Sequence, residues 1–253
     1  MVALIYLSIL PFPMQIPKSH PRYVSLLLRE KIIEGWKEGV VADAGLLAHG
    51  RGEAFDYLIG ESTQPFAILA MKYALHRMKR AKNSVISVNG NVCALCPKEV
   101  VELAKATNSK LEINLFYRTE ARVQKIAEKL REAGAVEIYG VNPDASIPGL
   151  EHARALCSRE GMYAADVVFV PLEDGDRVEA LKKMGKFVIA LDLNPLSRTA
   201  RSADVTIVDN VVRAIPKMLE MLKNGENLEV EGYDNNAVLN EARQRIWKVL
   251  SKL

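Results

Sequence analysis

The most constraining feature of this sequence is the alternation of short β-rich runs and helical patterns from about residue 80 onward. Strands are predicted at 84–88, 111–116, 136–139, 166–170, 187–191 and 203–208. Apolar residues at helical spacing separate or follow them, at 98–107, 120–133, 177–184, 211–223 and 235–253. Nearly continuous apolar strands that alternate with helices are typical of a parallel sheet covered on both faces. The sequence therefore predicts an α/β fold with a doubly wound, mostly parallel sheet.

The first third of the chain lacks strand patterns and is predicted to be helical. A helix over 19–39 is expected to begin with Ser19 as its cap and Pro21 in its first turn. Residues 64–82 form a second amphipathic helix. Between them, residues 40–63 are expected to form short helical pieces around a glycine-rich stretch.

The length of 253 residues fits one large domain or two small ones. We interpret the chain as one compact domain in which a helical N-terminal portion, 14–82, packs against an α/β portion, 83–253. Residues 1–13 are apolar but too short for a membrane span, and they lack a basic start and a cleavage site. We interpret them as an N-terminal extension, a start-site artefact if translation begins at Met14.

Composition excludes several classes of protein. The net charge is only +3 and aromatic residues make up 6%, so neither a basic stripe nor stacking aromatics indicate a nucleic-acid partner. Three cysteines, Cys93, Cys96 and Cys157, argue against a disulfide framework and for a reducing compartment. The lone CxxC of Cys93 and Cys96 has no second ligand pair nearby, so both are predicted to be buried, small apolar residues.

Polar residues gather directly after the predicted strands. They are Asn89, Asn91, Tyr117, Arg118, Glu173, Asp174, Asp176, Arg177, Asp192, Asn194, Ser197, Arg198, Thr199, Asp209 and Asn210. The carboxyl ends of parallel strands meet at one edge of the sheet, where ligands bind in doubly wound folds. Each loop alone also suits a turn or a helix cap. Their concentration nevertheless indicates a binding site at this edge.

The residues at this edge suit a nucleotide, although neither GxGxxG nor GxxxxGK[ST] is present. Asp192 or Asp209 can accept hydrogen bonds from ribose hydroxyls. Asn194 and Asn210 carry the paired donor and acceptor groups that suit an adenine edge. Arg198 lies near the start of a predicted short helix, where it suits a phosphate.

The segment His49-Gly50-Arg51-Gly52-Glu53 places an arginine between two glycines. Glycine disfavours a stable helix and lets a ligand approach the backbone closely. The arginine then indicates an anionic ligand. The alternative is a solvated turn between two helices.

Several long stretches together resemble one known family. They are IPKSHPRYVSLLLREKIIEGWKEG, AGLLAHGRGEAFDYLIGEST, VISVNGN, KLEINLFYRTEARV, IPGLEHARA and DVVFVPLEDGDRVEALKKMGKFVIALDLNPLSRTARSADVTIVDNVVRA. From about Ile16 to the helix after Asn210, the chain resembles the archaeal phosphopantothenate synthetase family (4-phosphopantoate–β-alanine ligase). The resemblance implies a Rossmann-like homodimer. The composition favours a cytoplasmic protein without a nucleic-acid or membrane partner. It also implies condensation of 4-phosphopantoate with β-alanine through an acyl-adenylate, which releases AMP and pyrophosphate in coenzyme A biosynthesis.

The resemblance implies roles for individual residues. ATP is expected to contact Arg29, Arg51, Asp192, Leu193, Asn194, Arg198, Thr199, Asn210 and Val211. We expect 4-phosphopantoate at Lys18, His20 and Arg22. Arg51 is the predicted catalytic cation, and His49 is expected to orient a substrate or deprotonate β-alanine. ATP and Mg²⁺ are the expected cofactors, and no protein side chain is assigned as a metal ligand. The acidic trio Glu173, Asp174 and Asp176 either holds Mg²⁺ through water or forms a solvated turn.

Two rival interpretations remain open. Residues 185–204 also resemble phosphosugar-binding sugar-isomerase modules, many of which regulate without catalysis, but that leaves HGRGEAFD and SHPRY unexplained. The second rival is a kinase-like enzyme for a related acid, which would release ADP.

Overall fold

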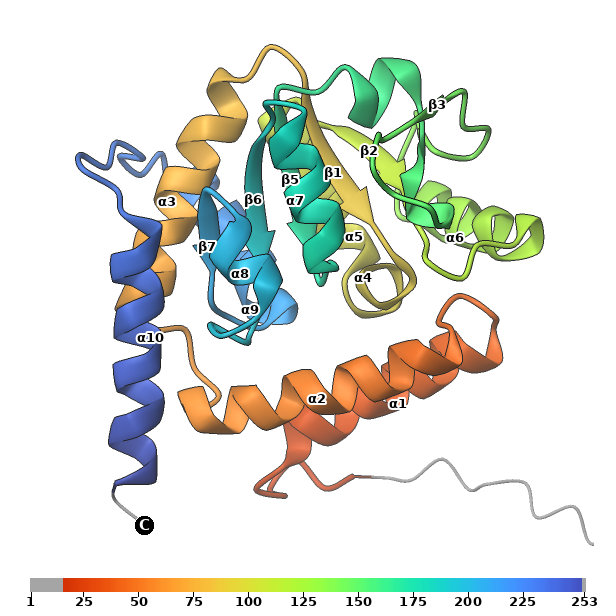
Figure 1. Ribbon diagram of the computed structural model, residues 1–253. Helices are drawn as coiled ribbons and strands as arrows, with labels where there is room; N and C mark the ends of the chain where they lie inside the picture. Colours follow the sequence, from red (N-terminus) through yellow and green to blue (C-terminus); the bar gives the residue numbers. More distant parts are fainter. Residues whose placement is uncertain (1–15, 252–253) are drawn as a thin grey trace, which may run out of the picture.

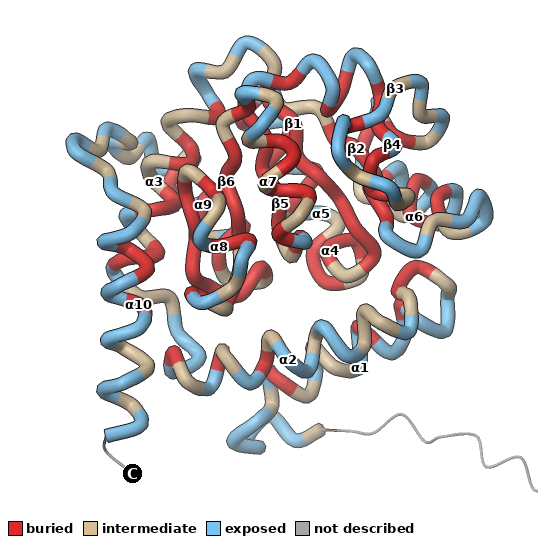
Figure 2. Tube along the Cα trace, viewed as in Figure 1, coloured by how far each residue is buried: buried red, intermediate tan, exposed pale blue. Residues whose placement is uncertain are grey.

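The computed structural model describes residues 16–251, and its centre is a parallel sheet of five strands in the order β2-β1-β5-β6-β7. The strands are β1 (Ser84–Val88), β2 (Lys110–Ile113), β5 (Val167–Pro171), β6 (Phe187–Leu191) and β7 (Val205–Ile207). Every residue of the central strand β5 is buried, because the sheet is covered on both faces (Figures 1 and 2). This confirms the predicted Rossmann-like, mostly parallel α/β architecture.

Alternation along the strands divides the core in two. Val85, Val168 and Val188 pair in register and point to the face covered by α7 (Gly175–Lys183). The next residues along the strands pack on the opposite side, against α3 (Pro65–Arg80), α5 (Pro97–Thr107), α6 (Glu120–Glu132) and α9 (Val211–Lys223). β-branched side chains pack well on both sides of such a pleated sheet.

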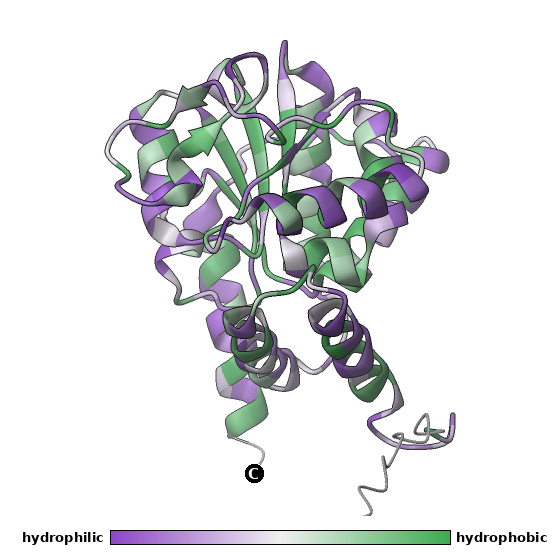
Figure 3. Ribbon diagram, turned by 90° about the vertical axis from the view of Figure 1, so that its right-hand side faces the viewer, coloured by the Kyte–Doolittle hydropathy of each residue, from purple (hydrophilic) through white to green (hydrophobic). Residues whose placement is uncertain are grey.

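The N-terminal helices α1 (Tyr23–Lys37) and α2 (Asp43–Ile59) lie next to the carboxyl ends of the strands (Figure 1). The C-terminal helix α10 (Asn235–Leu250) packs against α2 and α3. In Figure 3 the strands are mostly hydrophobic, whereas the outer helices carry both apolar and polar residues. The remaining elements are α4 (Gly90–Leu95), α8 (Arg198–Ser202), a hairpin of β3 (Ala145–Ser146) and β4 (Leu156–Cys157), a 3₁₀ turn η1 (Ala153–Ala155) and a π-helical turn η2 (Arg159–Tyr163).

Four local predictions were wrong. Residues 40–63 contain one continuous helix, α2, although Gly50 and Gly52 lie within it. Between the strand predicted at 84–88 and the helix predicted at 98–107, where no helix was predicted, residues 90–95 form α4, which is capped by the Asn89 side chain. Residues 136–139 form no strand, and Tyr139 makes only an isolated bridge to Glu112. The first helix begins at Tyr23, so Ser19 is not its cap and Pro21 precedes it.

Two predictions from composition can also be compared with the structure. The three cysteines are buried and unpaired in disulfides, as expected of small apolar residues. Burial raises the pKa of Cys93 to about 12. Residues 16–251 contain no helix with the length and apolar character needed to cross a membrane. The predicted extension 1–13 and the start at Met14 lie outside the described residues.

Candidate active site

A cleft of about 1250 Å³ lies between the α1–α2 pair and the carboxyl ends of the strands. It spans the crevice between β1 and β5, where the strand order changes direction and doubly wound folds bind ligands. Pockets for a single small ligand usually measure roughly 300–1,000 Å³. The cleft therefore has room for more than one substrate.

Most of the predicted site residues line this cleft. They are Lys18, His20, Arg22, His49, Arg51, Asp192, Leu193, Asn194, Arg198, Thr199, Asn210 and Val211. The exception is Arg29, whose guanidinium turns to Glu53, with Nη2 2.7 Å from Oε2. The structure thus brings together residues that are far apart in the sequence. Arg29 does not line the cleft itself but binds Glu53, which does.

Glu53 organises the facing sides of α1 and α2. Its carboxylate accepts hydrogen bonds from Arg29 Nε at 2.9 Å and Ser25 Oγ at 2.7 Å, and from the Tyr57 hydroxyl. Arg22 Nη2 lies 3.4 Å from the same carboxylate. Burial alone would raise the pKa of Glu53, but the hydrogen bonds from Arg29, Tyr57 and Ser25 lower it to about 2. Glu53 is therefore an ionised anchor for the two arginines.

The helical periodicity of α2 turns His49, Arg51 and Gly52 toward the cleft but leaves Gly50 off its wall. Arg51 is exposed. Burial raises the pKa of Asp192 above its ordinary value, although the positive charge of Arg51 acts in the opposite direction. Burial lowers the pKa of His49, so its imidazole is neutral near pH 7 and able to accept a proton. The glycine-flanked arginine is thus on a helix, not in a turn.

The loop after β6 is held by its own side chains. Asp192 Oδ1 accepts from the Asn194 backbone N–H at 2.9 Å, and Asp192 Oδ2 accepts from Ser197 Oγ. Ser197 Oγ in turn accepts from the Ala200 N–H and caps α8. These bonds fix the shape of the segment that carries Asp192 and Asn194 into the cleft.

The end of β7 is tied to α2 by a buried polar network. Arg213 Nη1 donates to Asp56 at 2.9 Å, and Arg213 Nε donates to Asp209 at 2.9 Å. Asn210 Nδ2 also donates to Asp56, and Thr63 Oγ1 donates to Asp209. Asp209 is fully buried and is not on the cleft wall, so Asp192 is the carboxylate that remains for a ribose.

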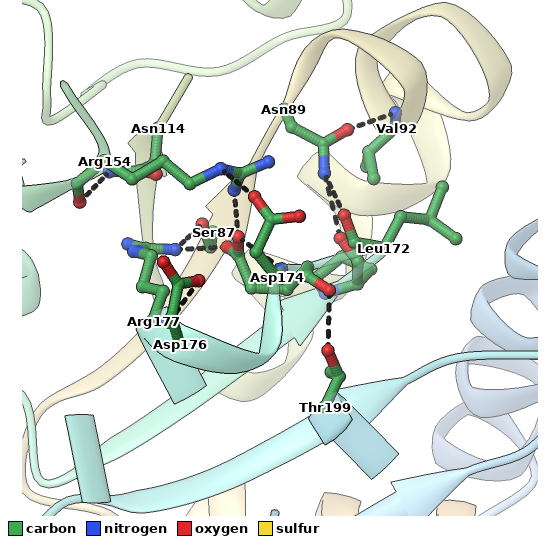
Figure 4. Close-up of polar contacts among 12 residues, drawn as sticks. Ser87, Asn89, Val92, Asn114, Arg154, Leu172, Asp174, Asp176, Arg177 and Thr199 are labelled. Atoms are coloured by element: carbon green, nitrogen blue, oxygen red, sulfur yellow. Dashed lines mark hydrogen bonds and ion pairs between the residues drawn. The ribbon is translucent and has the colours of Figure 1, made fainter. Parts of the chain in front are cut away.

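The end of β5 carries a second network, shown in Figure 4. The buried Glu173 carboxylate bridges the guanidinium groups of Arg154 and Arg177. Burial opposes ionisation of Glu173, but Arg154 and Arg177 hold its pKa below the usual range. Thr199 Oγ1 donates to the Glu173 carbonyl at 2.8 Å, which ties this loop to α8.

The acidic trio after β5 does not converge on a metal. Glu173 is enclosed by two arginines, Asp176 lies 2.8 Å from His152 Nε2, and Asp174 lines the cleft beside Arg154. Within residues 16–251 no three His, Cys, Asp or Glu side chains are grouped to hold a metal ion.

Comparison with known proteins agrees with this geometry. A sequence profile described as phosphopantothenate/pantothenate synthetase matches residues 66–249. The chain belongs to the phosphopantothenate/pantothenate synthetase family. This confirms the resemblance that the sequence motifs indicate.

Relatives of this synthetase family named 4-phosphopantoate–beta-alanine ligase match nearly the whole chain. The Thermococcus onnurineus protein is 59% identical over 94% of this chain and 95% of its own length. The Thermococcus kodakarensis protein is 58% identical over 94% of both chains. The Methanosarcina mazei protein is 51% identical over 94% of this chain and 96% of its own.

Sequence reasoning missed several cleft residues of this synthetase. Arg122 and Arg154 line the wall near β1 and β2, and Arg213 lines it near β7. None of the three immediately follows a predicted strand, so the rule that binding residues follow the strands does not identify them. The available signal for Arg154 was its place in IPGLEHARA, one of the stretches that resemble the family. Arg118, which does follow a strand, instead donates to the Gly140 and Val141 carbonyls.

Proposed function

We propose that this protein is an ATP-dependent ligase that condenses 4-phosphopantoate with β-alanine to give 4′-phosphopantothenate, a step of coenzyme A biosynthesis. The observation that carries the proposal is the large cleft, which is lined by most of the predicted nucleotide-binding and acid-binding residues in a member of this family. Its two sides offer carboxylate and amide groups near β6 and β7, and arginines near α1, α2 and β1.

ATP occupies the side of the cleft formed by the ends of β6 and β7. Asp192 accepts hydrogen bonds from the ribose hydroxyls, and Asn194 faces the adenine. Asn210 contributes to the cleft wall, but its amide is occupied by Asp56 and by the Val212 backbone N–H. Arg198, on the exposed first residue of α8, reaches the phosphates together with Thr199. Mg²⁺ is carried by the triphosphate oxygens, in keeping with its preference for phosphate ligands and few protein carboxylates.

Arg51 neutralises charge when the two anionic substrates meet. A carboxylate oxygen of 4-phosphopantoate attacks the α-phosphorus of ATP, and the bond from that phosphorus to pyrophosphate breaks. Negative charge builds on the phosphorus oxygens in the transition state, where a fixed guanidinium stabilises it. Arg29 supports this arrangement through Glu53, and it contacts ATP if it leaves that ion pair.

The second step joins the amine to the activated acid. The neutral amine of β-alanine attacks the acyl carbon of the adenylate, a C–N bond forms, and AMP leaves with the bonding electron pair. The amine must lose a proton, and the neutral imidazole of His49 accepts it. Lys18, His20 and Arg22, at the start of α1, hold 4-phosphopantoate while this happens. Holding adenylate and amine together contributes much of the rate.

We also propose that the ligase acts as a homodimer. Helix α1 exposes apolar side chains that do not line the cleft, among them Leu27 at 38% and Ile33 at 37%. Light scattering during size-exclusion chromatography should give twice the chain mass of 28.1 kDa. A mass of one chain at micromolar concentration would overturn this part of the proposal.

The function is tested by a nucleotide product assay in which ATP, Mg²⁺, 4-phosphopantoate and β-alanine are omitted in turn. AMP that forms only with both acid and amine supports the ligase. ADP as the product would favour the kinase-like alternative. Stabilisation by a phosphosugar without any nucleotide turnover would favour the regulatory module, which relatives matching nearly the whole chain do not support.

A further inference from the structure

Two arginines, Arg122 and Arg154, lie on the cleft wall opposite the proposed nucleotide side. Arg122 belongs to the first turn of α6, and Arg154 belongs to η1 in the hairpin connection. Both arginines lie near the carboxyl end of β1. Arg122 Nη2 is beside Gly90, and Asn114, whose backbone N–H donates to the Val88 carbonyl, donates its side-chain amide to the Arg154 carbonyl. In keeping with this, burial and the charge of Arg154 lower the pKa of Arg122. Two like charges in one partly buried region indicate an anion that completes it.

Arg122 has no carboxylate partner among residues 16–251. Its Nε donates to the Val40 carbonyl at 2.9 Å and its Nη1 to the Tyr117 carbonyl at 2.8 Å. These two bonds hold the guanidinium beside Gly90, where a Cβ would meet Arg122 Nη2 at 2.6 Å. Nη2 makes no hydrogen bond within the described chain. Arg122 is thus fixed by neutral groups and keeps its full positive charge for a ligand.

Arg154 is largely buried, but it is one of the residues that line the cleft. Its Nη1 donates to Glu173, which is itself held by the fully buried Arg177 (Figure 4). Its Nε lies 2.7 Å from Asp174 Oδ2, but the geometry is too poorly aligned for a hydrogen bond. The Asp174 side chain is 49% exposed, so it can swing away into solvent. A phosphate with better geometry would replace this carboxylate.

The sheet order separates this arginine pair from the nucleotide. Gly90 follows β1, whereas Asp192 and Asn210 follow β6 and β7, beyond β5. An acid whose carboxylate meets the α-phosphate of ATP in the middle of the cleft extends its other end toward β1. In 4-phosphopantoate that other end is the phosphate.

We propose that Arg122 and Arg154 form the subsite that binds the phosphate of 4-phosphopantoate, with Glu173 as the positioning residue for Arg154. The inference rests on the proposed function and adds a specificity determinant to it. Lys18, His20 and Arg22 then serve the remainder of the acid, and the unphosphorylated acid lacks the group that this subsite recognises.

The test is calorimetric binding without ATP, with 4-phosphopantoate and unphosphorylated pantoate as probes. Arg154→Ala should weaken 4-phosphopantoate binding by about 10- to 100-fold, the range for charge-assisted hydrogen bonds, and leave pantoate binding nearly unchanged. Arg154→Lys should restore only part of the affinity, because lysine cannot bind phosphate bidentately. Arg118→Ala is the control: Arg118 donates to backbone carbonyls, as Arg122 does, but it does not line the cleft, so both affinities should be retained.

A second variant, at a partly exposed residue, is expected to strengthen the binding of 4-phosphopantoate instead of weakening it. Asp174→Asn removes the carboxylate that competes for Arg154, so it should bind 4-phosphopantoate up to about 5-fold more tightly, the worth of an exposed ion pair. Weaker or unchanged binding of 4-phosphopantoate by Asp174→Asn would contradict the inference that the phosphate replaces the Asp174 carboxylate at Arg154. Equal losses for both probes in Arg154→Ala would assign the arginines to the carboxylate and overturn the subsite.

Turnover separates this inference from the function on which it rests. If the wild-type protein releases AMP but the folded Arg154→Ala variant binds 4-phosphopantoate normally, the subsite is rejected and the proposed function stands. Wild-type protein that forms no AMP with all substrates present rejects the proposed function.

Discussion

Arg51 is the residue whose removal tests the proposed chemistry most directly. Arg51→Ala should lower the rate of AMP release by roughly 10²- to 10³-fold, the effect of losing one group that stabilises transition-state charge. Because Arg51 is exposed, the melting temperature should stay within about 1 °C of wild type. Arg201→Ala is the control, since Arg201 is also exposed but is outside the cleft wall. A near-normal rate in Arg51→Ala would remove the catalytic role.

Glu53 gives the single-residue prediction that depends on pH. Its folded-state pKa is about 2, below the ordinary value of 4.5, so its contribution to stability is present above pH 4.5 and is lost as the pH falls toward 2. A shift of this size corresponds to about 3 kcal/mol. Glu53→Gln should therefore be less stable to urea at pH 7 by up to that amount, and the difference should shrink below pH 4.5. Glu102→Gln, on an exposed position of α5, should show no such trend. A difference that persists unchanged at pH 3 would contradict the ionised anchor.

At the scale of elements, the sequence predicts the strands and helices whose apolar faces are buried. It does not predict an element that depends on contacts with residues far away in the sequence. The five parallel strands and the helices α3, α5, α6, α7 and α9 were predictable because their apolar periodicity follows directly from two covered sheet faces. Helix α2 was not, because three glycines in eight residues (Gly45, Gly50 and Gly52) disfavour a helix unless tertiary contacts offset them. The side chains of Glu53 and Asp56, bound to arginines of α1 and α9, are such contacts. They are invisible in the local sequence.

Of the cleft residues, only those that follow strands could be predicted from the sequence. Residues that directly follow strands, such as Asp192 and Asn210, reach the cleft because the sheet brings all strand ends to one edge. Arg154 reaches it from a 3₁₀ turn between two short strands, and no periodic pattern predicts the path of such a connection. The position of Arg29 depends on one partner, Glu53, so its rotation out of the cleft wall could not be anticipated either.

The glycines of α2 give a prediction at this scale. A Cβ on Gly50 would have no atom within 4 Å, so Gly50→Ala should stabilise the protein by about 0.5–1 kcal/mol and leave AMP release unchanged. A Cβ on Gly45 would collide with Asn91 Oδ1 and lie 2.7 Å from Val41 Cγ1, so Gly45→Ala should destabilise by about 1–3 kcal/mol. Urea unfolding measures both. Destabilisation by Gly50→Ala would mean that α2 needs a glycine there for a reason other than packing.

For the whole molecule, the question is whether the helical portion and the α/β portion unfold together. Arg213 on α9 donates to Asp56 on α2, and Arg245 on α10 donates to the Ile59 carbonyl at 2.9 Å. These polar ties join α2 to two helices of the other portion, and the cleft is complete only when both portions are in place. We therefore expect the two portions to unfold together.

Two spectroscopic probes can test that coupling in one experiment. The chain has two tryptophans, so Trp247→Phe leaves Trp36 on α1 as the sole fluorescent reporter of the helical portion. Its urea transition should coincide with the far-ultraviolet circular dichroism transition of the whole chain, because one domain unfolds in one step.

In the same background Arg213→Ala leaves Asp209 and Asp56 without their shared cation, which costs about 3–5 kcal/mol for a buried pair. The fluorescence transition should then move to lower urea than the dichroism transition, whereas Arg243→Ala, at an exposed site on α10, should leave the two together. Separate transitions already in the Trp247→Phe protein would show that the two portions are independent domains, and the cleft between them would then form by docking rather than by a common fold.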